Sequence, residues 1–364
     1  MSYINTIKRF AKRTLSAQQL SGLSNISAAL EKSAYSHKGR AIFKHMCNII
    51  AVRPLMLNLE TYTACNAKCV FCARRKIPQA KELMPIRLFR RICSEYAQMG
   101  GGYLGFSPLL ADPLLDPLLL ERIYIIKNNF PTISLHLFTN GIALQNFSDD
   151  QLIKIINSLK HINISIGGLT KETYETMMGV NQFEAVIASL ERLSKIKQKI
   201  NTACKLVLHI RTNRMRETLN SSVLDKLKKL GYNCSDIMDT FSSWDGLVTE
   251  NDLPDGTAII KRNNTGCKIP CLIPMSYMTV MPDASVLACG CIDANTSTLI
   301  GNLDNSTLTQ IWQGPKLKAF RNSFTDDNLY SVCKSCGYYK NYEVVFSRPG
   351  LKNFEPSMNL WEHV

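Results

Sequence analysis

Along residues 54–245, short strand-forming runs alternate with longer stretches whose apolar positions recur at helical spacing. In Asn181–Ile196, apolar side chains at positions 183, 186, 187, 190 and 193 share one helical face, and Pro85 suits the first turn of a second helix, Pro85–Met99. This alternation is typical of βα units that build a parallel sheet. Six strands are predicted: Leu55–Glu60, Gly102–Ser107, Ser134–Thr139, Ile162–Gly167, Lys205–Ile210 and Asp236–Phe241.

Polar or unusual residues follow each predicted strand at the same end. Parallel strands with crossover helices carry their ligand sites at the carboxyl ends, in open sheets and in barrels alike. We therefore predict an α/β fold, a partial (β/α)6 TIM-like barrel with its active site at these ends. The residues concerned are a three-cysteine loop starting at Cys65, Leu110–Pro113, Thr139–Gly141, Ser165, His209 with Arg211, and Trp244–Gly246.

The composition changes after residue 250. Asn, Asp, Gly and Thr fill Asn251–Gly266, which indicates a linker into a small metal-stapled domain ending near Tyr339. A chain of 364 residues exceeds the usual size of one core, so a large and a small domain are expected. The predicted division is 1–53, a basic N-terminal helical extension; 54–250, the barrel domain; 251–340, the small domain; and 341–364, a C-terminal tail.

Positive charge is concentrated at the N-terminus. Of the net charge of +14, residues 1–53 supply +8, from nine Lys or Arg against one acid, Glu31. Such an arm favours phosphorylated substrates, nucleic acid or a membrane surface, although a solvated helical face is the alternative. The chain has no run of eighteen apolar residues and no apolar signal-peptide stretch. We expect a cytoplasmic protein without a transmembrane segment, whose basic N-terminus could touch a membrane surface.

Thirteen cysteines are many for a cytoplasmic protein, where reducing conditions favour metal binding over disulfides. Their clustering supports metal binding. Four scattered cysteines, Cys47, Cys93, Cys204 and Cys234, are expected to be small buried apolar residues. The other nine form three groups: Cys65, Cys69 and Cys72; Cys267, Cys271, Cys289 and Cys291; and Cys333 with Cys336.

The first group places three thiolates within eight residues, directly after a predicted strand. A [4Fe–4S] cluster normally takes four cysteines, so three would leave one iron with an open position, as a catalytic zinc keeps one. A zinc knuckle or unrelated thiols are the alternatives. The run Cys65-Asn66-Ala67-Lys68-Cys69-Val70-Phe71-Cys72 resembles the CxxxCxΦC motif of the radical S-adenosylmethionine (radical SAM) superfamily, with Phe71 at the aromatic position.

This resemblance extends over roughly residues 54–340. It implies a [4Fe–4S] cluster whose open iron is chelated by the amino and carboxyl groups of S-adenosylmethionine, which is cleaved to a 5′-deoxyadenosyl radical. A flavodoxin- or ferredoxin-type electron donor is expected with it. The stretch Leu110–Pro113 takes the place of the family's Gly-Gly-Glu-Pro, which contacts the amino group of the cosubstrate. Since both glycines are replaced and Asp112 is shorter than Glu, we expect backbone contact at Ala111 and Asp112.

Three further positions match the family singly. With Thr139, Asn140 matches a position near the ribose and methionyl groups, as does Ser165, and Arg211 matches a basic residue that faces the carboxylate. A structural role for Arg211 is the alternative.

The second set of cysteines consists of Cys271, Cys289 and the pair Cys333 and Cys336. A hairpin predicted to turn at Pro282–Ala284 would bring Cys271 and Cys289 together. The block is similar to SPASM domains and their shorter form, twitch. The full form needs further cysteines, which residues 337–364 lack, so the twitch form with one auxiliary [4Fe–4S] cluster is favoured over a four-cysteine zinc site.

Cys267 and Cys291 are left unassigned by this pattern. Either could replace a ligand, donate a hydrogen atom to a substrate radical, or be a buried thiol.

The resemblance implies hydrogen abstraction, with the auxiliary cluster as an electron acceptor. We expect oxidation (dehydrogenation) or epimerisation of a sugar, cyclitol or nucleotide-linked carbohydrate, and the basic entrance suits an anionic one. One alternative is an enzyme that modifies peptides or proteins. Another is a metal-stapled nucleic-acid-binding protein without catalysis, which the basic arm supports but the lack of aromatic pairs spaced for base stacking opposes.

Overall fold

The computed structural model describes residues 37–77, 80–106 and 109–346, beginning with helix α3 (His37–Val52). Most of the predicted basic extension, and the tail beyond Phe346, lie outside the described residues. None of the helices within those ranges is long and apolar enough to cross a membrane.

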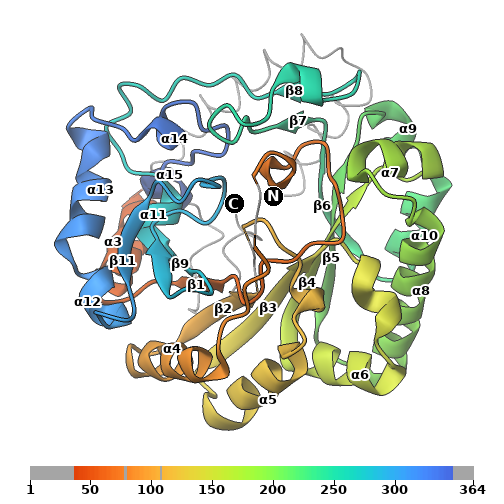
Figure 1. The fold of residues 1–364 in the computed structure, drawn as a ribbon, viewed down its shortest axis with the longest axis horizontal. Coiled ribbons are helices and arrows are strands. Elements are labelled where there is room, and N and C mark those ends of the chain that lie inside the picture. The colour runs from red at the N-terminus through yellow and green to blue at the C-terminus, as the bar shows by residue number, and fades with distance from the viewer. Residues whose placement is uncertain (1–36, 78–79, 107–108, 347–364) are drawn as a thin grey trace.

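Six strands run parallel and neighbour one another in chain order, which confirms the predicted α/β class. The sheet curves, and its connecting helices lie on the outside of the curve, as in a partial barrel (Figure 1). The strands are β1 (Met56–Leu59), β2 (Gly102–Phe106), β3 (Ile133–Thr139), β4 (Leu159–Gly167), β5 (Lys205–Arg211) and β6 (Asn233–Met238).

The connecting helices begin where the sequence offers caps. Ser148 and Gln151 form a reciprocal capping box at the start of α6, and Thr170 caps α7 in the same way. Gly179, in the left-handed region at φ 67°, ends α7. The helices are α4 (Ile86–Gln98), α5 (Leu119–Asn129), α6 (Asp149–Ser158), α7 (Lys171–Met178), α8 (Phe183–Ile200), α9 (Met215–Leu219) and α10 (Ser222–Lys229).

The sixth predicted strand, Asp236–Phe241, is wrong as one continuous strand. After β6 the chain leaves the sheet, and β7 (Thr240–Phe241) pairs with β8 (Ala258–Ile259) in a separate two-stranded sheet. This departure carries the Phe241 ring onto Phe71, with ring centroids 4.7 Å apart and the planes 10° from parallel. The interruption between β6 and β7 therefore lets Phe241 pack against the first cysteine loop.

The C-terminal hairpin forms as predicted, but it extends the large sheet. β9 (Tyr277–Val280) and β10 (Ser285–Leu287) pair antiparallel, and Ala284 takes a left-handed φ of 68° in the turn. β9 also pairs in parallel with β1, and β11 (Leu299–Asn302) follows β10, so nine strands share one sheet. Without β9, β1 would expose an unpaired edge.

Short helices cover the hairpin. Trp312 donates its indole N–H to the carbonyl of Ile50 at 2.8 Å and so ties α12 to α3. These helices are α11 (Leu272–Ser276), α12 (Leu308–Trp312), α13 (Pro315–Thr325), α14 (Ser331–Lys334) and α15 (Tyr342–Phe346).

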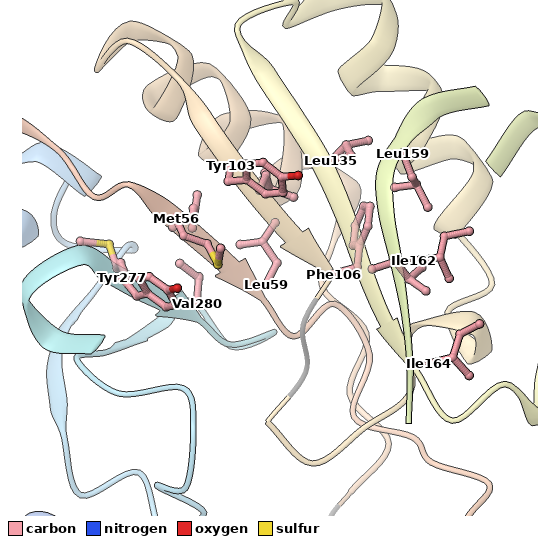
Figure 2. Close-up of a cluster of buried hydrophobic side chains, with 14 of the residues drawn as sticks. Met56, Leu59, Tyr103, Phe106, Leu135, Leu159, Ile162, Ile164, Tyr277 and Val280 are labelled. Atoms are coloured by element: carbon pink, nitrogen blue, oxygen red, sulfur yellow. The ribbon is translucent and has the colours of Figure 1, made fainter. Parts of the chain in front are cut away.

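One hydrophobic core runs beneath both parts of the sheet. Met56 from β1 and Tyr277 from β9, which are register partners, are both 1% exposed (Figure 2). The core therefore continues across the boundary between the predicted domains, whose exact division remains a prediction. Of the four scattered cysteines, Cys93 and Cys204 are buried as expected, whereas Cys47 and Cys234 are half-buried.

Candidate functional site

The first cysteine loop leaves β1 and is held by the last turn of α7. The backbone N–H groups of Lys68 and Val70 donate to the carbonyls of Met178 and Met177, at 2.9 and 3.0 Å. A side chain at Gly179 would place its Cβ 2.5 Å from the carbonyl oxygen of Lys68, so this close approach requires glycine. Backbone contacts thus fix the loop.

The thiols of Cys65, Cys69 and Cys72 lie close enough to influence one another's ionisation. Burial raises the pKa of all three thiols, that of Cys72 to about 11, and neighbouring cysteines raise the pKa of Cys69 and Cys72 further. Thiolates repel one another in such a site unless a cation compensates them. All three are free of disulfides, so the residues fit a cationic iron–sulfur cluster.

Two side chains contact the sulfurs of this loop. The amide of Asn140 donates to Asn66 Oδ1 at 2.8 Å and lies 3.7 Å from Cys65 Sγ, and Met178 Sδ is 3.7 Å from Cys69 Sγ. The resemblance predicts that Asn140 lies near the cosubstrate, and the structure shows its contact with the cysteine loop.

Phe71 is held by aromatic neighbours. Its ring stacks on Phe241, and its carbonyl accepts the indole N–H of Trp244 at 2.9 Å. The aromatic position of the motif therefore packs the loop against the end of the barrel.

The carboxylate of Asp112 is occupied by hydrogen bonds within the protein. Its carboxylate accepts from Thr139 Oγ1 at 3.0 and 2.9 Å, from the backbone N–H of Asn140 at 2.7 Å and from that of Leu114 at 3.0 Å. Burial raises the pKa of Asp112, although these hydrogen bonds oppose the rise. Because the side chain joins the ends of β2 and β3, only backbone in this stretch is available for a ligand, and Ala111 is its half-buried point.

Glu60 is a site residue that the sequence analysis counted only as a strand end. Its carboxylate Oε2 accepts the backbone N–H groups of Leu109 and Leu110 at 2.7 and 3.4 Å. It is fully buried, and burial raises its pKa to about 7 against the lowering effect of those bonds and of Arg74. An acid directly after an apolar strand was the available signal.

The opposite wall of the barrel carries a row of polar side chains. His209 lies 2.8 Å from Asp236 Oδ1 through Nδ1 and 3.1 Å from Asn163 Oδ1 through Nε2, and Arg211 lies 3.3 Å from Asp236 Oδ2. Burial would raise the pKa of Asp236, but Arg211 and His209 outweigh it and lower the pKa to about 2. Arg211 is thus already ion-paired, while Ser165 on β4 is half-buried.

The structure brings together the four cysteines of the second predicted set and adds a fifth. Burial raises the pKa of all five thiols, and neighbouring cysteines raise the pKa of Cys289, Cys291, Cys333 and Cys336 further. Cys291 belongs to this group, whereas Cys267 interacts with Tyr339 instead. The five thiols, here called the auxiliary thiols, are Cys271, Cys289, Cys291, Cys333 and Cys336.

Asn264, fully buried, positions part of this group and was not found from the sequence. Its side-chain amide donates to the carbonyls of Cys333 and Cys336 at 2.8 and 3.0 Å, and its backbone N–H donates to the carbonyl of Lys334. It therefore fixes the Cys-x-x-Cys turn. An asparagine among the polar residues of a linker gave no signal for this role.

Tyr338 lies within electrostatic range of both Arg211 and Cys291. Burial raises the pKa of Tyr338, Arg211 lowers it, and Cys291 raises it. Tyr338 is thus near a member of the polar row and a member of the auxiliary thiols. In the described residues, no three His, Cys, Asp or Glu side chains converge on a single-ion site. A cubane differs because it spreads its cysteine ligands over several irons.

Two family models match the chain. The model of the radical SAM superfamily covers residues 59–221, and the model of the iron–sulfur cluster-binding SPASM domain covers residues 271–337. The chain therefore contains a radical SAM domain followed by a SPASM domain. These matches confirm the expected resemblance and the expected cofactors, namely [4Fe–4S] clusters and S-adenosylmethionine.

Solved structures show the same fold at low identity. BtrN in complex with AdoMet and 2-DOIA has a TM-score of 0.53 and 17% identity, covering 79% of this chain and 96% of that one. Streptococcus suis SuiB bound to precursor peptide SuiA has a TM-score of 0.51 and 14% identity, covering 80% and 71%. These likenesses support the radical SAM fold.

The curated relatives match only part of the chain. A GTP 3′,8-cyclase of Chlorobaculum tepidum is 25% identical over 150 residues, which are 40% of this chain and 44% of the relative. A probable GTP 3′,8-cyclase of Thermococcus kodakarensis is 28% identical over 144 residues, 38% and 43% respectively. The chain therefore spans less than half the length of these relatives.

Proposed function

We propose that this radical SAM protein oxidises or epimerises an anionic carbohydrate, namely a sugar, cyclitol or nucleotide-linked sugar. The observation that carries the proposal is the row of hydrogen-bonded polar side chains Asn163, His209, Asp236 and Arg211, with Arg211 and the auxiliary thiol Cys291 both in electrostatic range of Tyr338. Such hydrogen-bonding groups suit a ligand rich in hydroxyls.

In this proposal, Cys65, Cys69 and Cys72 hold the cluster with the open iron, and Cys271, Cys289, Cys333 and Cys336 hold one auxiliary [4Fe–4S] cluster. Bound S-adenosylmethionine supplies the 5′-deoxyadenosyl radical that removes a substrate hydrogen. The chain's own part is positioning: Glu60 and Asp112 fix the backbone near Ala111, Phe71 packs the loop, and Asn140, Ser165 and Arg211 face the cosubstrate.

The fate of the substrate radical separates the two reactions. In oxidation, the substrate radical would lose one electron, for which an auxiliary cluster held by these cysteines would be the acceptor, and the hydroxyl proton, so that a carbonyl forms. In epimerisation, a thiol would give a hydrogen atom to the opposite face, and the resulting thiyl radical would take up one electron, from the expected flavodoxin- or ferredoxin-type donor, and one proton to become a thiol again. Cys291, which lies within electrostatic range of Tyr338, and Cys267 are the two donor candidates.

The names of relatives support both this proposal and one rival. The two cyclases are named for GTP, which favours a nucleotide-linked substrate, and BtrN was solved with 2-DOIA. SuiB was solved with a precursor peptide, which favours a peptide-modifying enzyme instead. We propose a cytoplasmic reaction fed by a flavodoxin- or ferredoxin-type donor.

The test is anaerobic incubation of the reconstituted protein with S-adenosylmethionine, dithionite and a panel of sugar phosphates, nucleotide sugars, GTP and short peptides. Mass spectrometry would find a product lighter by one hydrogen molecule for oxidation, or an isomer carrying solvent deuterium in D2O for epimerisation. Modification of peptides alone would overturn the carbohydrate proposal. A Cys291→Ala variant that still forms the deuterated isomer would exclude Cys291 as donor.

A further inference from the structure

Helix α7 presents two side chains toward the Cys69 corner of the first loop. Met178 touches Cys69, with Sδ and Sγ 3.7 Å apart. Tyr174 lies one helical turn before Met178, so the two share a face of α7. Both side chains are 1% exposed. Tyr174 therefore lies beside Met178, the side chain that contacts the Cys69 corner.

The hydroxyl of Tyr174 is buried and forms no hydrogen bond with any described residue. Its ring packs beside Phe183, with centroids 5.8 Å apart, which fixes the direction of the ring. Burial raises the pKa of Tyr174, and Cys69 raises it further, so the hydroxyl and the thiol lie within electrostatic range. A buried hydroxyl without a partner costs stability, which indicates that a partner is missing.

A cluster held by Cys65, Cys69 and Cys72 would supply such a partner. Its sulfurs carry negative charge and accept hydrogen bonds, and these bonds are among the factors that set reduction potential. The same loop already shows one donor near sulfur, because the Asn140 amide lies 3.7 Å from Cys65 Sγ. Tyr174 would be the hydrogen-bond donor at the Cys69 corner.

We propose that Tyr174 donates its hydroxyl hydrogen to sulfur at the Cys69 corner of the cluster and thereby raises the reduction potential of that cluster. A hydrogen bond to sulfur stabilises the reduced form more, because reduction adds negative charge to the cluster. Tyr174 acts through the cluster and is a tuning residue. This inference rests on the family and on the first loop, and it would survive failure of the proposed carbohydrate substrate.

The test compares Tyr174→Phe with the wild type by redox titration followed by electron paramagnetic resonance. The signal of the first cluster is recognised because S-adenosylmethionine, which binds the open iron, alters it. We expect the equilibrium to shift toward the oxidised form on the order of tenfold, which corresponds to 59 mV for a one-electron couple. The auxiliary signal should keep its potential.

Tyr232→Phe is the matched control. It also removes a buried hydroxyl, but that hydroxyl donates to the carbonyl of Leu190 at 2.8 Å, away from both cysteine groups. It should leave both potentials unchanged. Because Tyr174 makes no hydrogen bond to the described protein, its Phe variant should fold and take up iron normally.

A second measurement uses electron–nuclear double resonance on the reduced first cluster. The wild type and Tyr232→Phe should show an exchangeable proton, replaced in D2O, that Tyr174→Phe lacks. The proposal is overturned if Tyr174→Phe keeps the wild-type potential, if Tyr232→Phe shifts it equally, or if the wild type shows no proton that the Tyr174 variant loses.

Discussion

The two thiol groups are built in opposite ways. The first takes three cysteines from one short loop, which is held in place by backbone hydrogen bonds from its Lys68 and Val70 to the last turn of α7. The auxiliary group draws five cysteines from three separated segments, joined by the β9–β10 hairpin and Asn264. A loop that offers only three cysteines leaves one iron of a [4Fe–4S] cluster open for a cosubstrate. A group of four or more cysteines from distant segments can ligate every iron of its cluster.

Replacing Cys65, Cys69 or Cys72 by Ala should have the largest effect. Loss of one of three ligands removes the cluster, so formation of 5′-deoxyadenosine should cease, and iron content should fall by about half if the auxiliary cluster stays. Cys93→Ala, at a buried cysteine outside both groups, is the control and should cleave normally. Undiminished cleavage in a loop variant would refute the assignment.

Ala at Cys271, Cys289, Cys333 or Cys336 should lower the iron content and loosen the auxiliary segments, because metal binding contributes folding free energy. Hydrogen exchange should increase around residues 288–298 and 331–340, while β9, which pairs with β1, stays protected. Cleavage of S-adenosylmethionine should decline less than in the Cys65, Cys69 and Cys72 variants. If the wild-type protein binds stoichiometric zinc at the auxiliary thiols and keeps full turnover, the metal there does not act as electron acceptor.

Glu60→Gln should change the pH dependence of stability. The folded state keeps a proton to about pH 7 that the unfolded chain releases near 4.5, so the free energy of unfolding falls as pH rises between these values. At about 1.4 kcal/mol per pH unit, over about 2.5 units, the loss is at most about 3 to 4 kcal/mol. Denaturant titrations of the holoprotein at pH 5 and 8 should show a smaller difference for the Gln variant. An equal difference would contradict the raised pKa.

Two glycine variants should have the smallest effects, each on one of the two cysteine groups. Gly179→Ala forces a left-handed Cβ against the Lys68 carbonyl, and Gly290→Ala places a Cβ 2.1 Å from Thr279 Oγ1, each costing about 2 kcal/mol. Gly179→Ala should impair cleavage of S-adenosylmethionine and leave the iron of the auxiliary group in place. Gly290→Ala should lower the auxiliary iron content and leave cleavage largely intact. Adding Thr279→Ala should rescue Gly290→Ala alone. Equal damage to both groups by either variant would argue that they are not independent.

Sequence patterns predicted the local features well and the distant pairings poorly. Periodicity located the parallel strands and the hairpin because each depends on neighbouring residues. It could not reveal that β9 pairs with β1, since register between segments 220 residues apart leaves no local pattern. Glu60, Asn264 and Tyr174 were missed for a related reason: their roles depend on groups that only the fold brings near.

The pairing of β9 with β1 also bears on how the chain is made. β1 is synthesised early, but its second partner follows more than 200 residues later. During translation, at roughly 5–20 residues per second, this edge stays open for on the order of ten seconds or longer. A nascent chain in that state exposes backbone groups that another nascent chain could pair with. Expression at low temperature or with chaperones should therefore raise the yield of assembled protein more than extra iron does.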